Sequence, residues 1–376
     1  GGACPCCGTM QSYVCPACGG VVSSSRREAH ESAWCPARVG QDENDEEEVK
    51  PSSKAGLGGP RALFSSLCEA EVVATFGSLR CLRFSMVQQD MFGAADTGGA
   101  LWYADRVMAE YLAGGGLDAA TSSGVLAEVP GARPDELDRD DAAGGCTAEQ
   151  GRRTRGLALA LGCGGVPLSG FVAAALGWKV VLTDLGIVLD QTRQNVRRNL
   201  DAVRSARAAL GIDRDEVEDD IEVRELPFGD EQALDAALSR WHAPSEEAGP
   251  LVLLCSDCIW KPELHTILVK TFVSALQRGA SGGGGGFTGA CALVSFQKRS
   301  PTNEALFMKC LKEAEVLRFE RVDIAEVLQL VQWPSQVGAD TLRGCDLVNE
   351  FQLFRLTLAP AGAPAPVGAA AGAVAH

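Results

Sequence analysis

The stretch "LALALGCGGVPLSGFVAAALGWKVVLTDL", residues 157–185, constrains the fold more than any other part of this chain. An apolar run of strand length, residues 156–161, ends at a cluster of glycines, and an apolar helical stretch follows at about residues 168–177. A second β-rich run, residues 179–184, then ends on an aspartate. A strand, a glycine turn, a helix and a second strand form a βαβ unit, which places two parallel strands in one sheet.

Further strands of the same kind follow, and we expect them at residues 221–226, 251–257 and 291–296. Most lack alternation of apolar and polar residues, which is typical of strands covered by helices on both faces. Helical stretches lie between them. Two strand-like segments, "EVLRFERVD" and "NEFQLFRLTL", end the region with only a short, partly helical gap between them. The pattern predicts a doubly wound, Rossmann-like α/β sheet with an antiparallel closing pair.

Composition divides the chain into four parts. We expect a Cys-rich segment at 1–40, an acidic linker at 41–59, one α/β domain at 60–358 and a disordered tail at 359–376. Within the domain, residues 113–155 and 279–290 are rich in glycine or acids and are predicted to be surface insertions.

The charge of the chain limits its partners. The formal net charge of −15 at pH 7 argues against nucleic acid as a partner, because a polyanion would be repelled. No run of about 18 apolar residues could span a bilayer, and no basic segment followed by an apolar one resembles a secretory signal. We therefore expect a monomer in the cytoplasm or the nucleus, without a membrane partner.

The glycine turn predicts a ligand site. Gly162 and Gly164 allow a sharp turn off the first strand and expose backbone N–H groups at the start of the helix. Asp184 ends the second strand, where an acid typically accepts hydrogen bonds from ribose hydroxyls. Pro167 stands where a dinucleotide fingerprint has its third glycine, so a nucleoside ligand without phosphates fits better. The spacing alone does not separate NAD from S-adenosylmethionine, and an ordinary βα turn stays an alternative.

Six motifs follow one another in an order that resembles a known family. They are "GGALWYADRVMAEYL" (98–112), the stretch at 157–185, "NVRRNL" (195–200), "VRELPFGD" (223–230), "LCSDCIWKPELHTILVKTF" (254–272) and "LVSFQKRSPTNEALFMKCLKEA" (293–314). Together they resemble the seven-β-strand S-adenosylmethionine-dependent protein methyltransferases of lysine methyltransferase family 16, the methyltransferase-like 21 group, over about residues 75–358.

The resemblance implies a site for S-adenosylmethionine and a protein substrate. The cofactor-binding residues that it implies are Trp102, Gly162, Gly164, Asp184, Phe228 and Ser256. Asp257 and Trp260 match the catalytic Asp-x-x-Tyr of the family, with Trp in place of Tyr. Trp102 and Phe228 could instead be core residues, and Asp257 a helix cap.

Three departures from the family bear on activity. Ala160 stands where the family commonly has Glu or Asp, the loop from Gly162 to Gly170 is one residue longer, and Trp260 lacks the phenol hydroxyl. Three hypotheses follow. The first, which we favour, is an active protein-lysine methyltransferase. The second is an adaptor that has lost its cofactor, and the third is a nicotinamide-dependent oxidoreductase.

The Cys-rich front segment predicts a zinc site. Cys15 and Cys18 have CxxC spacing, and His30 and Cys35 follow at intervals that resemble a CCHC-type zinc finger. Cys4 and Cys7 form a rival CxxC pair, and an unstructured Cys-rich leader is the alternative to a metal site. Few basic residues lie near the finger, which favours docking to a protein over reading of DNA.

Overall fold

The computed structural model describes residues 12–14, 21–23, 71–88, 96–121, 155–212, 217–241, 249–280, 287–333 and 347–360. The four predicted zinc ligands, the acidic linker and residues 361–376 of the predicted tail lie outside the described residues. Near the front of the chain, β1 (Ser12–Val14) and β2 (Val21–Ser23) form an antiparallel pair of their own.

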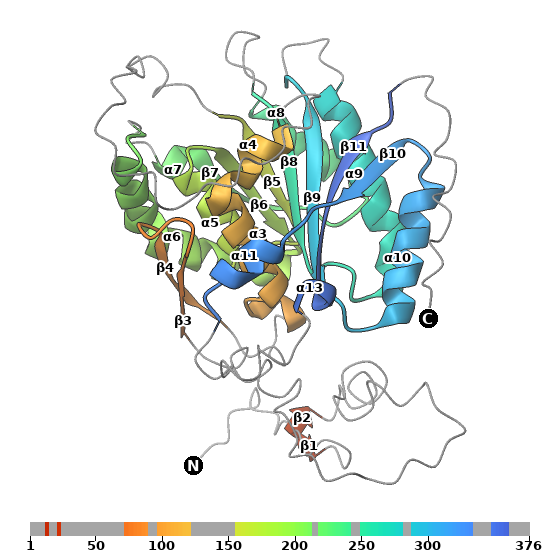
Figure 1. Cartoon of the computed structure of the whole chain (residues 1–376), viewed down its shortest axis with the longest axis horizontal. Coiled ribbons are helices and arrows are strands. Elements are labelled where there is room, and N and C mark those ends of the chain that lie inside the picture. The colour runs from red at the N-terminus through yellow and green to blue at the C-terminus, as the bar shows by residue number, and fades with distance from the viewer. Residues whose placement is uncertain are drawn as a thin grey trace, which may run out of the picture.

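A seven-stranded sheet in the order β10-β11-β9-β8-β5-β6-β7 forms the centre of the α/β region (Figure 1). Its strands are β5 (Leu157–Leu161), β6 (Lys179–Asp184), β7 (Ile221–Glu225), β8 (Leu251–Ser256), β9 (Ala290–Gln297), β10 (Leu317–Arg321) and β11 (Phe351–Leu358). The neighbours from β7 to β9 pair in parallel, whereas β11 pairs antiparallel with both β9 and β10. The predicted Rossmann-like sheet with an antiparallel closing pair is confirmed. Every residue of β5 is buried, which explains why its sequence does not alternate.

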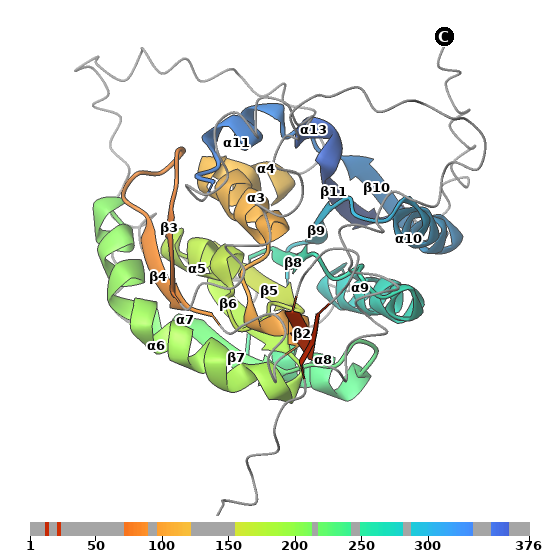
Figure 2. The ribbon, with the colours of Figure 1, turned by 90° about the horizontal axis from the view of Figure 1, so that it is seen from below.

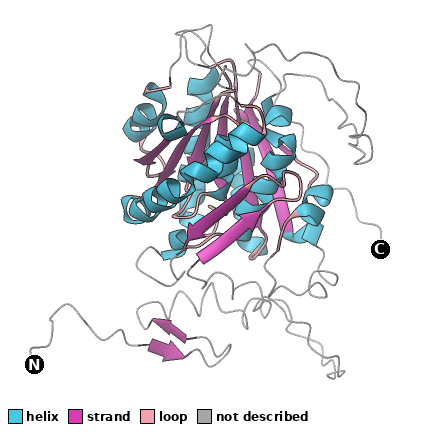
Figure 3. Cartoon of the chain, turned by 90° about the vertical axis from the view of Figure 1, so that its left-hand side faces the viewer, coloured by secondary structure: helices cyan, strands magenta, loops and turns pink. Residues whose placement is uncertain are grey.

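Helices cover both faces of the sheet (Figures 2 and 3). One face packs against α3 (Tyr103–Tyr111), η5 (Leu112–Gly116), α4 (Leu117–Thr121), α5 (Leu168–Ala175), α6 (Gly186–Ala209), α7 (Val217–Asp220) and α11 (Ala325–Leu330). The other face packs against α8 (Glu231–Ser239), α9 (His265–Ala280) and α10 (Pro301–Glu313). Three short helices, η4 (Asp96–Gly99), η7 (Pro262–Leu264) and α13 (Leu347–Glu350), lie in the connections. No helix among the described residues is long and apolar enough to cross a membrane.

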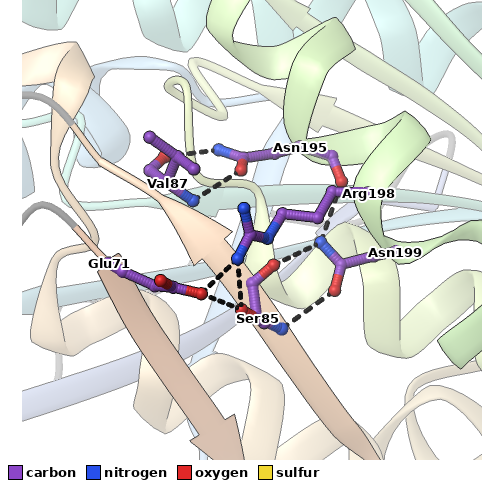
Figure 4. Close-up of polar contacts among 6 residues, drawn as sticks. All are labelled: Glu71, Ser85, Val87, Asn195, Arg198 and Asn199. Carbon is purple, nitrogen blue, oxygen red and sulfur yellow. Dashed lines mark hydrogen bonds and ion pairs between the residues drawn. The ribbon is translucent and has the colours of Figure 1, made fainter.

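The sequence did not predict the hairpin of β3 (Glu71–Thr75) and β4 (Arg83–Val87), which α6 holds through side-chain amides (Figure 4). The Asn195 amide accepts from the Val87 N–H and donates to the Val87 carbonyl, both at 2.7 Å. The Asn199 amide does the same with Ser85 at 2.9 Å. Four residues of helix rise about 6 Å, and two residues of strand rise about 6.6 Å. The two amides therefore match alternate residues of β4 and bond to an edge that no strand of the described residues covers.

The expected insertion at 113–155 begins later than predicted. Its first residues continue the helical segment through η5 and α4, where Leu117 and Ala120 are almost fully buried. Gly115 takes a φ of +94° within this segment. The glycine-rich sequence did not predict a helix here, and tertiary packing stabilises it. Residues 122–154 lie outside the described part of the chain.

Candidate functional site

A cavity of about 590 Å³ opens at the carboxyl ends of β5, β6 and β8. Ligands of doubly wound sheets bind at this edge. All eight residues predicted for cofactor binding and catalysis line it: Trp102, Gly162, Gly164, Asp184, Phe228, Ser256, Asp257 and Trp260. They come from five separate segments, so the cavity brings together residues that span more than 150 positions of sequence.

The glycine turn after β5 requires its glycines. Gly162 has a φ of +60° and Gly164 a φ of +66°, in the left-handed region that other residues rarely adopt. A Cβ on Gly162 would lie 2.7 Å from Cys258 Sγ and 3.1 Å from Phe228 Cζ. A Cβ on Gly164 would lie 2.9 Å from the Gly98 carbonyl oxygen. The turn therefore packs backbone against its neighbours and forms one wall of the cavity.

Asp184 lies at the end of β6 with its carboxylate in the cavity wall. Its Oδ2 accepts from the Gly164 N–H and its Oδ1 from the Leu185 N–H, both at 2.7 Å. Burial raises the pKa of this carboxyl above its ordinary value, and the two N–H bonds oppose that shift. Each oxygen keeps a further lone pair, so the carboxylate can also accept from the hydroxyls of a ligand.

Asp257 follows β8 in a left-handed conformation, with a φ of +59°. Its Oδ1 accepts from the Gln297 N–H at 3.1 Å, and its Oδ2 pairs with the Arg299 guanidinium at 2.5 Å. The Arg299 guanidinium also lies 4.5 Å from the centroid of the Trp102 ring. The buried Asp257 carboxylate therefore forms an ion pair with Arg299, and it does not cap the helix that follows.

Sequence reasoning missed Arg299, although it lies within one of the six motifs. It follows β9, the neighbour of β8, and the parallel pairing brings the ends of these two strands together. A basic residue after the strand next to the predicted acid was the available signal.

Trp260 lies beside Lys261 at the cavity. The Lys261 Nζ is 4.0 Å from the centroid of the Trp260 ring, within range of a cation–π contact. An ammonium from the chain itself thus covers one face of the Trp260 ring.

Phe228 and Ser256 complete the predicted set. The Phe228 ring packs against the glycine turn at Gly162, and its partial exposure faces the cavity. The Ser256 and Ser295 hydroxyl oxygens lie 3.0 Å apart, so the end of β8 contacts that of β9.

Asp105 is a further cavity residue that sequence reasoning missed. It lies on α3, and its Oδ2 accepts from the backbone N–H groups of Leu168 at 2.9 Å and Ser169 at 3.3 Å. These N–H groups begin α5, whose N-cap residue, Pro167, has no capping side chain. Burial raises the pKa of the Asp105 carboxyl, while hydrogen bonds from Ser169 and from the Ser256 side chain lower it. The position of Asp105 within its helical stretch did not indicate that its carboxylate contacts the start of α5.

The described residues contain no cluster of three side chains that could hold a metal ion. Residues 4–36 match the family model of the C2HC zinc finger. This match confirms the zinc finger that the Cys and His spacing predicted, and which residues bind the ion stays a prediction because Cys4 and Cys7 fall within the same match. A search of curated proteins found no match to the chain.

Solved structures that resemble the chain include several methyltransferases. The delta-N METTL16 methyltransferase domain is 12% identical, with a TM-score of 0.30, over 54% of this chain and 72% of that one. The human methyltransferase 10 domain containing protein is 14% identical, with a TM-score of 0.29, over 57% and 75%. The O-methyltransferase NcsB1, in complex with S-adenosylmethionine, is 16% identical, with a TM-score of 0.28, over 55% and 49%. Similarities at this level carry no argument about function, and the fold assignment rests on the strand order.

Proposed function

We infer that this chain is an S-adenosylmethionine-dependent methyltransferase whose acceptor is a lysine side chain of a protein. One observation carries the inference: eight residues chosen from motif resemblance, on five separate segments, line a single cavity at the carboxyl edge of the sheet. The volume lies in the range of about 300–1,000 Å³ that is usual for small-molecule sites.

The residues present suit a nucleoside cofactor without phosphates. Asp184 has lone pairs for ribose hydroxyls, and the Phe228 ring offers an apolar face for a base. A pyrophosphate would need the N–H groups at the start of α5. The Asp105 carboxylate already accepts from those groups and would repel a phosphate, which argues against a nicotinamide dinucleotide and the oxidoreductase hypothesis.

Few catalytic side chains are needed for this chemistry. S-adenosylmethionine, when bound, supplies an electrophilic methyl group on a sulfonium. The protein must present a neutral amine in line with that methyl group and exclude water. Arg299 and Lys261 bring two cations to the cavity, and nearby positive charge lowers the pKa of an incoming lysine, which favours its nucleophilic form. Asp257, held by Arg299, would orient the amine as a hydrogen-bond acceptor.

The adaptor hypothesis depends on Ala160, because the expected acid is absent there. Calorimetry with S-adenosylhomocysteine separates it from the enzyme. Clear binding by the full chain supports the enzyme, and no binding at millimolar ligand would favour the adaptor.

The activity test uses tritiated S-adenosylmethionine and a cell extract, and it measures label on lysine. Asp257→Asn should lower labelling at least about tenfold, which corresponds to about 1.4 kcal/mol of barrier, while cofactor affinity changes little. Asp201→Asn is the matched control, since it alters an exposed aspartate–arginine pair on α6 and should label like the parent. Equal labelling by the Asp257 variant and the parent would remove Asp257 from the mechanism.

The zinc finger has a separate proposed role, which is to dock the protein substrate or its complex. A chain that lacks residues 1–40 should bind S-adenosylhomocysteine like the full chain but label fewer proteins in the same extract.

A further inference from the structure

Three carboxylates line the cavity: Asp105, Asp184 and Asp257. Asp184 lies at the end of β6, beyond the glycine turn, where it suits the ribose. The Asp257 charge is balanced by Arg299. Asp105 differs from Asp257 because its hydrogen bonds come from backbone N–H groups, those of Leu168 and Ser169, and not from a guanidinium.

Asp105 lies on the same side of the sheet as Ala160, the position where the family commonly has an acid. Ala160 on β5 lies beside Leu254 on β8, and its side chain belongs to the hydrophobic cluster that includes Leu101, Tyr103 and Val107 around α3. The face of the sheet toward which an acid at 160 would project is therefore the face that α3 covers. Both residues line the cavity.

Ser256, at the end of β8, lies near Asp105. It is two residues beyond Leu254, and its side chain lowers the pKa of the Asp105 carboxyl, which burial raises. The neighbouring backbone of α3 is also anchored, since the Ala104 carbonyl accepts from the Ser295 hydroxyl at 3.0 Å. Asp105 is 8% exposed, so its carboxylate has little access to bulk water.

The amino acid end of S-adenosylmethionine carries an ammonium group. Enclosing an ammonium without an anionic or carbonyl partner is costly. We propose that Asp105, from α3, supplies the carboxylate that pairs with this ammonium and replaces the acid absent at position 160. The proposal rests on the proposed function, because it assigns a residue within the same cofactor site. It also explains how the cavity can retain its cofactor although β5 ends without an acid.

The test compares two ligands by calorimetry on the full chain. S-adenosylhomocysteine has the amino acid end, and 5′-methylthioadenosine has the same nucleoside thioether without it. Asp105→Asn should weaken S-adenosylhomocysteine binding at least tenfold and leave methylthioadenosine binding unchanged. Asparagine keeps an oxygen that can accept from the Leu168 and Ser169 N–H groups, so α5 remains capped. Asp184→Asn is the comparison, and it should weaken the binding of both ligands.

A second variant tests the replacement directly. Ala160→Glu added to Asp105→Asn should restore part of the lost S-adenosylhomocysteine affinity without changing methylthioadenosine binding.

Three results would overturn the proposal in distinguishable ways. If Asp105→Asn weakened the binding of both ligands equally, Asp105 would only stabilise the start of α5. Unchanged binding of both ligands would leave the cofactor site standing and place the ammonium elsewhere. Failure of the parent to bind either ligand would overturn the proposed function itself.

Discussion

Replacement of Gly162 by alanine should destabilise the protein through two separable effects. The first is the backbone conformation, since a left-handed φ costs a residue with a Cβ about 1–2 kcal/mol. The second is crowding, because the new Cβ would lie 2.7 Å from Cys258 Sγ and 3.1 Å from the Phe228 ring. Overpacking of a buried site typically costs about 1–3 kcal/mol. The sum for Gly162→Ala is therefore about 2–5 kcal/mol.

Gly211 offers a matched control for the backbone effect. It follows α6 with a φ of +69°, and a Cβ there would meet no atom within 4 Å. Gly211→Ala should then cost about 1–2 kcal/mol, the conformational part alone. Urea unfolding of both variants, extrapolated to water, measures the difference.

Cys258→Ala in the Gly162→Ala background removes the closest contact and should recover part of the crowding cost. In a double-mutant cycle the two changes should couple by at least about 0.5 kcal/mol. The reasoning fails if Gly162→Ala costs no more than Gly211→Ala, or if the cycle shows no coupling. S-adenosylhomocysteine affinity is a second readout, and it should fall in Gly162→Ala and stay constant in Gly211→Ala.

The remaining predictions concern the hairpin, a thiol and the metal. Asn195→Leu leaves the Val87 N–H and the Gly165 carbonyl without their partner, whereas Gln191 still donates to the Val87 carbonyl, and it should cost about 2–4 kcal/mol in urea unfolding. Arg198→Ala, which removes an exposed ion pair, should cost much less, and similar losses would contradict the amide contacts. Burial, and then the charges of two aspartates, raise the pKa of the Cys163 thiol well above its ordinary value. Iodoacetamide at pH 8 should therefore modify the exposed Cys81 long before Cys163. Equal modification rates of the two cysteines, measured by peptide mapping, would contradict this. The full chain should contain one zinc by elemental analysis and lose it in Cys18→Ser, and a metal content unchanged by that substitution would move the site to other cysteines.

The sheet was predictable because its strands carry their own signal. Strands such as β5 and β8 are apolar along almost their whole length, since helices cover both faces, and glycines or acids mark where they end. The predicted and observed bounds of β6 agree at residues 179–184. The same property made the carboxyl edge of the sheet recognisable, and with it the position of Gly162 and Asp184.

The hairpin was not predictable, because its stability is not local. β3 and β4 have five residues each and alternate between exposed and buried positions, and side chains of α6 satisfy the free edge of β4 from more than 100 positions away. Asn195 and Asn199 read in sequence as polar residues of an amphipathic helix. Only the fold shows that they are buried and bonded to β4.

Two cavity residues were missed for a related reason. The role of Asp105 depends on α3 crossing the start of α5, 63 positions further along the chain, and helical spacing alone presents it as an ordinary polar residue. Arg299 acquires its role from the register of β8 and β9, which brings its guanidinium to Asp257. Motif resemblance found the residues whose types are characteristic, and missed those whose significance depends on contacts.

The three cavity carboxylates together indicate which kind of ligand the site can accept. Each one is already held, Asp184 by two N–H groups, Asp105 by the start of α5 and Asp257 by Arg299. Burial raises the pKa of Asp105 and of Asp184, and a nearby cation would lower the pKa of either carboxyl again. At the start of α5 a phosphate would meet the Asp105 carboxylate where it needs donors, and its charge would oppose that of Asp105. A ligand with a sulfonium and an ammonium meets acceptors that are fixed before it arrives, so little reorganisation is needed on binding. The role that we propose for Asp105 therefore favours a cationic nucleoside over a nucleotide as the ligand of this cavity.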